Sequence, residues 1–67
     1  MNVHMVYNGE NWDYGMEDLN LNEQSSDNDV LNALSEQAGI PRVKLNGFVV
    51  NRSDSGDVTV SPRAIFG

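Results

Sequence analysis

Residues 3–16 alternate between apolar and polar side chains on either side of an Asn8-Gly9 dipeptide. A period of two is typical of a strand with one buried face. Asn-Gly favours a type I′ turn, because both residues tolerate a positive φ, and such a turn joins two antiparallel strands. Residues 2–17 are therefore predicted to form a β-hairpin, whose aromatic residues pack toward the core. Its apolar positions are Val3, Met5, Tyr7, Trp12, Tyr14 and Met16.

The next segment contains the start and stop signals of a helix. Two leucines within residues 18–28 would extend the second strand, and the polar remainder is predicted to be a loop. Ser26 and Asp29 have the spacing of a capping box. Gly39 favours a left-handed end and Pro41 prevents continuation, which predicts a helix of about 10–12 residues. The apolar face of this helix consists of Val30, Leu31, Leu34 and Ala38.

The last part of the chain has the composition of strands and turns. Val43 and Leu45 alternate with charged neighbours and predict a short strand. Asn46-Gly47 is a second tight-turn signal, from which residues 48–50 would return. A polar connection then leads to a final strand over residues 58–61.

The whole chain, residues 1–67, is predicted to be a single α+β domain of order β-β-α-β-β. It contains no cysteine, so regular secondary structure must stabilise its small core. Two arrangements fit: a mixed sheet in which the last strand pairs in parallel with the first, or a meander with the helix on top.

No segment approaches the roughly 20 apolar residues of a membrane span, and no signal peptide is visible, so a cytoplasmic location is expected.

Charge is divided unevenly along the chain. Residues 1–41 contain eight acidic residues and no lysine or arginine, whereas residues 42–67 contain four basic and two acidic residues. The net charge of −6 disfavours nucleic-acid binding and favours a basic protein partner, although acidic side chains also keep a small domain soluble.

His4 lies on the polar face of the hairpin without a second histidine or a cysteine, so neither a catalytic role nor a metal site is expected.

From residue 30 onward the chain resembles the ThiS/MoaD-type sulfur carriers of the ubiquitin-like superfamily. The resemblance rests on a leucine-rich helix, a Gly-plus-aliphatic end, an Asn-Gly turn before a Val-Val-x-Arg strand, a Gly-Asp turn and a terminal glycine. The matching segments are Val30–Leu34, Gly39-Ile40, Val43–Ser53, Gly56–Val60 and Arg63–Gly67. This resemblance implies a β-grasp (ubiquitin-like) fold with a mixed sheet packed on one helix.

The resemblance also implies a mechanism. In the family, the tail threads a narrow channel of an E1-like adenylating partner, which activates the terminal carboxylate with ATP. That carboxylate is then converted to a thiocarboxylate or joined to a target amine. Gly67 would carry this group here, and Arg63 would dock the tail on an acidic surface. Ile65 and Phe66 would add apolar contact. ATP and the catalytic cysteine would belong to the partner, so this chain is expected to be a monomeric binding protein without a cofactor of its own.

The tail differs from the family pattern at one position, because the family ends in Gly-Gly and this chain ends in Phe66-Gly67. A non-conjugating acidic binding protein of the same fold is therefore the alternative, such as an adaptor or inhibitor of phage type. A third possibility is an acidic mimic of nucleic acid. A partner-binding patch is predicted from an aromatic residue among basic ones, a composition that protein interfaces favour. Its residues are Phe48, Arg42, Lys44 and Arg52.

Overall fold

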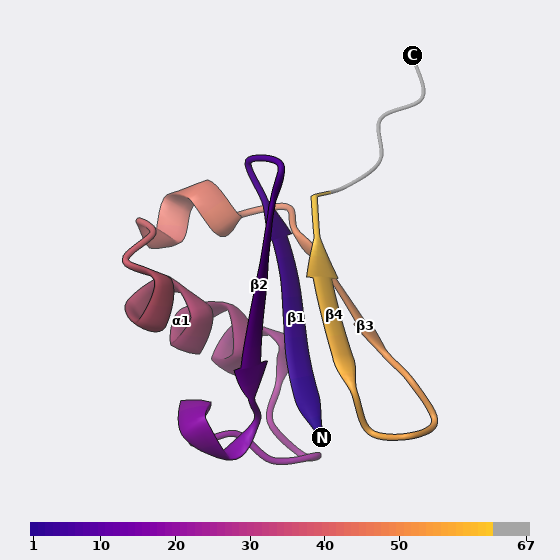
Figure 1. Ribbon diagram of the computed structural model, residues 1–67. Helices are drawn as coiled ribbons and strands as arrows, with labels where there is room; N and C mark the ends of the chain where they lie inside the picture. Colours follow the sequence, from indigo (N-terminus) through magenta and orange to yellow (C-terminus); the bar gives the residue numbers. More distant parts are fainter. Residues whose placement is uncertain (63–67) are drawn as a thin grey trace.

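The structure, a computed structural model, describes residues 1–62 and contains one mixed four-stranded sheet with a helix across one face (Figure 1). The strands are β1 (Asn2–Tyr7), β2 (Glu10–Gly15), β3 (Val49–Arg52) and β4 (Val58–Ser61). The helix is α1 (Asp27–Ala38), and two 3₁₀ helices are η1 (Glu17–Leu19) and η2 (Arg42–Leu45). No helix within residues 1–62 is long and apolar enough to cross a membrane.

The predicted hairpin is confirmed. Strands β1 and β2 pair antiparallel around a turn in which Asn8 and Gly9 have φ of 53° and 79°. Both values are positive, as a type I′ turn requires. Trp12 lies opposite Met5 and therefore faces the core side, but it is only half-buried. The reason is that β2 is an edge strand of the sheet.

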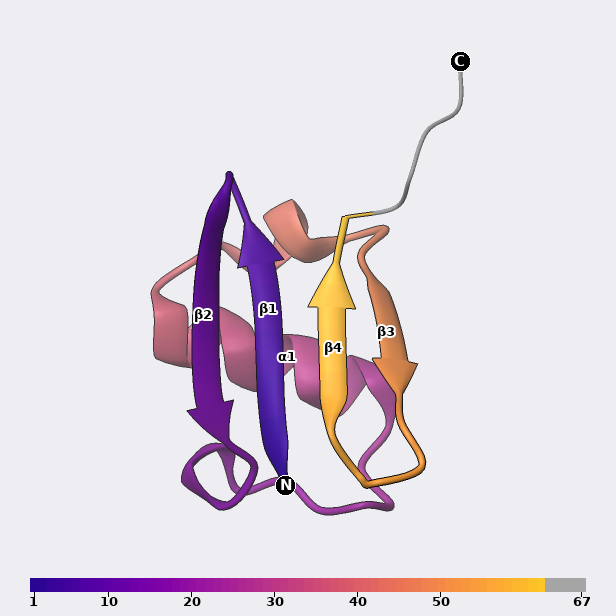
Figure 2. The ribbon, with the colours of Figure 1, turned by 45° about the vertical axis from the view of Figure 1, so that its right-hand side comes forward.

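The order of strands is β2-β1-β4-β3, with β4 parallel to β1 and antiparallel to β3 (Figure 2). In this register Val3 pairs with Val58 and Met5 pairs with Val60. All four side chains are buried. The first and last strands thus form the centre of a mixed sheet, and the chain adopts an α+β, β-grasp-like fold instead of a meander.

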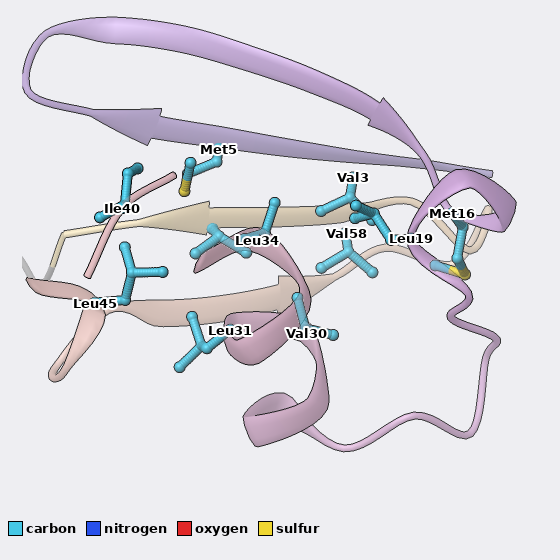
Figure 3. Close-up of a cluster of buried hydrophobic side chains, with 11 residues drawn as sticks. Val3, Met5, Met16, Leu19, Val30, Leu31, Leu34, Ile40, Leu45 and Val58 are labelled. Atoms are coloured by element: carbon cyan, nitrogen blue, oxygen red, sulfur yellow. The ribbon is translucent and has the colours of Figure 1, made fainter. Parts of the chain in front are cut away.

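Helix α1 begins and ends where the sequence predicts. The Ser26 side chain accepts a hydrogen bond from the Asp29 backbone nitrogen, and the Asp29 carboxylate accepts one from the Ser26 backbone nitrogen. Gly39 ends the helix with a φ of 70°. The helix places Val30, Leu31 and Leu34 against the sheet, where they join a core of eleven buried side chains (Figure 3).

The expected strand around Val43 and Leu45 is not present. Residues 42–45 form the 3₁₀ helix η2, in which Lys44 nitrogen donates to Pro41 oxygen at 2.9 Å. Consequently Leu45 is buried at the end of the core, whereas Val43 is 66% exposed. Asn46-Gly47 is therefore no hairpin turn and leads directly into β3. A compact turn is favoured here because it allows Leu45 to close the core (Figure 3).

The expected extension of the second strand by two leucines is also wrong. The chain turns into η1 after Gly15, and Leu19 is buried in the core while Leu21 is half-buried. Asn20 ends this turn in the left-handed region, with a φ of 56°. Continuing an edge strand would leave Leu19 exposed, whereas the 3₁₀ turn places it over the other end of the core.

Candidate functional site

One face of the sheet is covered by α1, and the opposite face carries no other element of residues 1–62 (Figure 2). This open face is mostly polar. Across it, the strand register places Asp13, His4, Thr59 and Asn51 in one row. Val49 is 38% exposed and Val6 is half-buried. None of these residues lines either of the two hollows described below.

A hydrogen-bonded pair of side chains joins the two strands of the hairpin on this open face. The Nδ1 atom of His4 lies 2.6 Å from the Oδ1 atom of Asp13, and the two side chains are 35% and 72% exposed. The hydrogen bond to Asp13 raises the pKa of His4 above its usual value, despite the opposing effect of desolvation. Because the two residues lie directly opposite each other on paired strands, we assign the pair a structural role between strands.

The predicted partner-binding residue Arg42 is held along helix α1. Its guanidinium donates to the Oδ1 atoms of Asn32, Asn46 and Asn28 at 2.7, 2.9 and 3.0 Å. These amides satisfy its donors without neutralising its charge. Arg42 therefore connects η2 to helix α1.

The four predicted patch residues differ in their surroundings. Arg52 donates to Ser25 oxygen at 2.7 Å and to Asp27 Oδ1 at 2.9 Å, at the end of β3. Phe48 precedes β3 and lies about 13 Å away along the chain, given the rise per residue of a strand. Its ring is half-buried, 6.1 Å from the ring centroid of Tyr7. Lys44 is exposed on η2. Arg42 donates to Asn28 and Arg52 donates to Asp27, so the two guanidinium groups contact neighbouring residues in the first turn of α1.

The predicted carrier residues Arg63, Ile65, Phe66 and Gly67 lie outside the described residues. The structure does describe where the preceding strand ends. Strand β4 runs parallel to β1 and finishes at the end of the sheet that also holds the hairpin turn and η2 (Figure 1). Pro62 therefore follows an inner strand beside the Tyr7–Phe48 aromatic pair.

The opposite end of the domain holds a feature that the sequence did not predict. Two hollows of about 540 and 230 Å³ adjoin there, because Met16 and Glu23 line both. We call them together the acidic groove. The main side chains that line the larger hollow are Met1, Met16, Glu17, Asp18, Leu21 and Glu23. The smaller hollow is also lined by Arg52 and Asp54. The sequence shows the acidic bias of these residues, but the groove depends on how η1 and the following loop pack beside the β3–β4 turn.

The comparisons leave the family of the chain open. No protein-family model, no curated protein and no solved structure matches the sequence. Within residues 1–62, no group of three or more histidine, cysteine or carboxylate side chains is placed to hold a metal ion. The candidate functional regions are therefore the end of β4, which leads into the tail, and the acidic groove.

Proposed function

We propose that this chain is a small ubiquitin-like protein-interaction module that carries sulfur on its C-terminal glycine. The observation that supports this proposal is the parallel pairing of β4 with β1, which makes the strand before the tail an inner strand of a β-grasp-like sheet. A tail that follows an inner strand is anchored to the most strongly hydrogen-bonded part of the fold. Such an anchor allows a partner to bind the domain and the tail at the same time.

The proposed chemistry takes place at the Gly67 carboxylate. A carboxylate oxygen attacks the α-phosphorus of ATP, which forms an acyl-adenylate and releases pyrophosphate. A persulfide sulfur of the adenylating partner then displaces AMP, and reductive cleavage of the resulting acyl disulfide by a thiol leaves the thiocarboxylate. The adenylating partner supplies ATP binding and the persulfide, while this chain supplies the tail and the surface that positions it. The proposal places the protein in the cytoplasm, where ATP is available.

The alternative is a non-conjugating acidic adaptor or inhibitor of the same fold. Two observations favour it: Phe66 stands where the family has glycine, and several carboxylates gather around the acidic groove. Glycine lets a backbone approach a partner closely, whereas a phenylalanine requires space for its ring. In this alternative the acidic end of the domain binds the partner and Gly67 takes part in no reaction.

The intact mass of the protein isolated from its native host distinguishes the two. Carriage predicts the mass increase of one oxygen-to-sulfur replacement, which deletion of Gly67 abolishes. The matched variant Phe66→Gly restores a Gly-Gly end and is expected to form more adenylate with the host's adenylating enzymes and ATP. An unmodified mass, together with no adenylate from either the parent chain or Phe66→Gly, would reject sulfur carriage.

A further inference from the structure

The walls of the acidic groove are fixed by backbone hydrogen bonds. Met16 nitrogen donates to Met1 oxygen at 3.1 Å, and Met16 oxygen accepts from Leu21 nitrogen at 3.0 Å. The following turn is closed by Asn22, whose backbone nitrogen donates to Ser25 Oγ at 3.0 Å. The groove is therefore formed before any partner arrives, and binding would need little ordering of the chain.

The floor of the groove is apolar and reaches the surface. Met1 is 60% exposed, Leu21 is half-buried and Met16 connects the floor to the hydrophobic core. The Met1 side chain lies across the backbone of Gly56, with its sulfur 2.7 Å from where a Cβ on Gly56 would lie. Met1 lines the larger hollow and Gly56 lines the smaller one, so the Met1 side chain lies where the two meet. The larger hollow, about 540 Å³, falls within the usual size of ligand pockets.

The rim of the groove carries uncompensated negative charge. Glu17, Asp18 and Glu23 line the larger hollow, and all three are exposed. In the part of the chain that the structure describes, the ion pairs are His4–Asp13 and Arg52–Asp27, and neither includes a rim carboxylate. The Asp18 carboxylate also folds inward over Gly15, 2.9 Å from the position of a Cβ there. Arg52 lines the smaller hollow, but its guanidinium is paired with Asp27, so carboxylates predominate in the groove. A concave site with an excess of one sign of charge concentrates the opposite charge.

We propose that the acidic groove binds a basic segment of a partner protein. Lysine and arginine combine an aliphatic stem with a cationic head, and the groove presents a matching pair of surfaces. The stem would lie on Met1 and Leu21, while the head would reach the carboxylates of the rim. This proposal is independent of the tail chemistry, because the groove lies at the end of the sheet opposite to the end of β4.

The test is a two-dimensional ¹H–¹⁵N NMR titration of the full chain with the acetylated, amidated pentapeptide Gly-Arg-Leu-Lys-Gly. We expect saturable shifts in residues 16–23 and 53–58, and none at Glu36 on the helix. The pentapeptide Gly-Glu-Leu-Glu-Gly is the control ligand and should produce no such shifts. Added sodium chloride should weaken binding, since the charged groups are exposed.

Two variants with the same change of charge separate the groove from general attraction. Glu23→Gln removes a carboxylate that lines both hollows and should weaken peptide binding about two- to fivefold, as expected for one exposed charge pair. Glu36→Gln removes an exposed carboxylate on α1, outside the groove, and should leave the affinity unchanged.

Three results would overturn the proposal. The first is the absence of saturable shifts up to about 5 mM peptide, a limit that corresponds to negligible affinity. The second is an equal loss of affinity in Glu23→Gln and Glu36→Gln, which would indicate attraction by net charge alone. The third is saturation of the same residues by Mg²⁺ with no response to the peptide, which would make the groove a cation site. The host-protein mass experiment is unaffected by any of these results.

Discussion

Arg52, the last residue of β3, donates to Asp27, the first residue of α1, at 2.9 Å. The same guanidinium nitrogen donates to the carbonyl oxygen of Ser25 at 2.7 Å. These two contacts join the edge of the sheet to the start of the helix, across 25 residues of sequence. They give Arg52 a role in stability, whereas the sequence suggested a role in partner binding.

Replacement of Arg52 by glutamine should therefore lower the free energy of unfolding. The two side chains are 34% and 65% exposed, so the loss is expected to be about 0.5–1.5 kcal/mol. The matched control is Lys44→Gln, because Lys44 forms no hydrogen bond or ion pair from its side chain within residues 1–62. Urea unfolding followed by tryptophan fluorescence measures both variants. Equal stability of the two would show that the Arg52 contacts contribute nothing.

The His4–Asp13 pair should make stability depend on pH. Because the hydrogen bond to Asp13 raises the pKa of His4 in the folded state, folding favours protonated His4. This contribution is fully present below about pH 6.5, the usual pKa of histidine, and is lost as the pH rises through the raised pKa of the folded state.

Asp13→Asn should bring the pKa of His4 back toward its usual value and remove that part of the pH dependence. NMR titration of the His4 ring protons measures the pKa, and urea midpoints at several pH values measure stability. Glu10→Gln removes the same charge from β2 without touching His4 and serves as the control. An unchanged pKa in Asp13→Asn would contradict the assigned cause.

The position of η2 predicts that truncating its two apolar residues has unequal effects on stability. Leu45→Ala should cost about 2–4 kcal/mol, because Leu45 is fully buried in the core. Val43→Ala should change the free energy of unfolding by less than about 0.5 kcal/mol, because Val43 is 66% exposed. Chemical denaturation of both variants provides the comparison. Similar losses would instead indicate that the two side chains share a buried face, as in a strand.

Gly56→Ala should destabilise the β3–β4 turn and displace Met1. The φ of Gly56 is 91°, and a Cβ there would lie 2.7 Å from the Met1 sulfur. Gly9→Ala is the control, because Gly9 has a φ of 79° with no neighbouring atom within 4 Å of its Cβ position. Backbone strain of about 1 kcal/mol is expected in both variants. A change in the Met1 methyl signal is expected in Gly56→Ala alone, and its absence would contradict the contact.

Local signals account for the elements that sequence analysis predicted correctly. The hairpin follows from strict alternation around Asn8-Gly9, and the helix follows from Ser26 and Asp29 at one end and Gly39 at the other. Each of these signals acts over a few residues, so the local structure that it specifies does not depend on the rest of the chain. The parallel pairing of β4 with β1 involves residues 55 positions apart, and the sequence left it as one of two arrangements.

The two 3₁₀ helices and the acidic groove depend on tertiary packing. Val43 and Leu45 alternate as in a strand, but in the 3₁₀ helix Leu45 is buried at the end of the core while Val43 is exposed. The groove forms only where η1, the loop after it and the β3–β4 turn pack together. No sequence motif within any one of these segments predicts that packing. The partner-binding patch around Phe48 stays a prediction, and its two arginines both donate to the first turn of α1, at Asn28 and Asp27.

The central pairing of β1 with β4 also constrains the order of events during synthesis. Strand β1 leaves the ribosome early, but the neighbour that completes its second edge is made more than fifty residues later. Until then the growing polypeptide offers an N-terminal hairpin with an unpaired edge and an uncovered aromatic face, a form open to aberrant association. Rapid translation through residues 18–57 would shorten that exposure, and a translational pause there would prolong it.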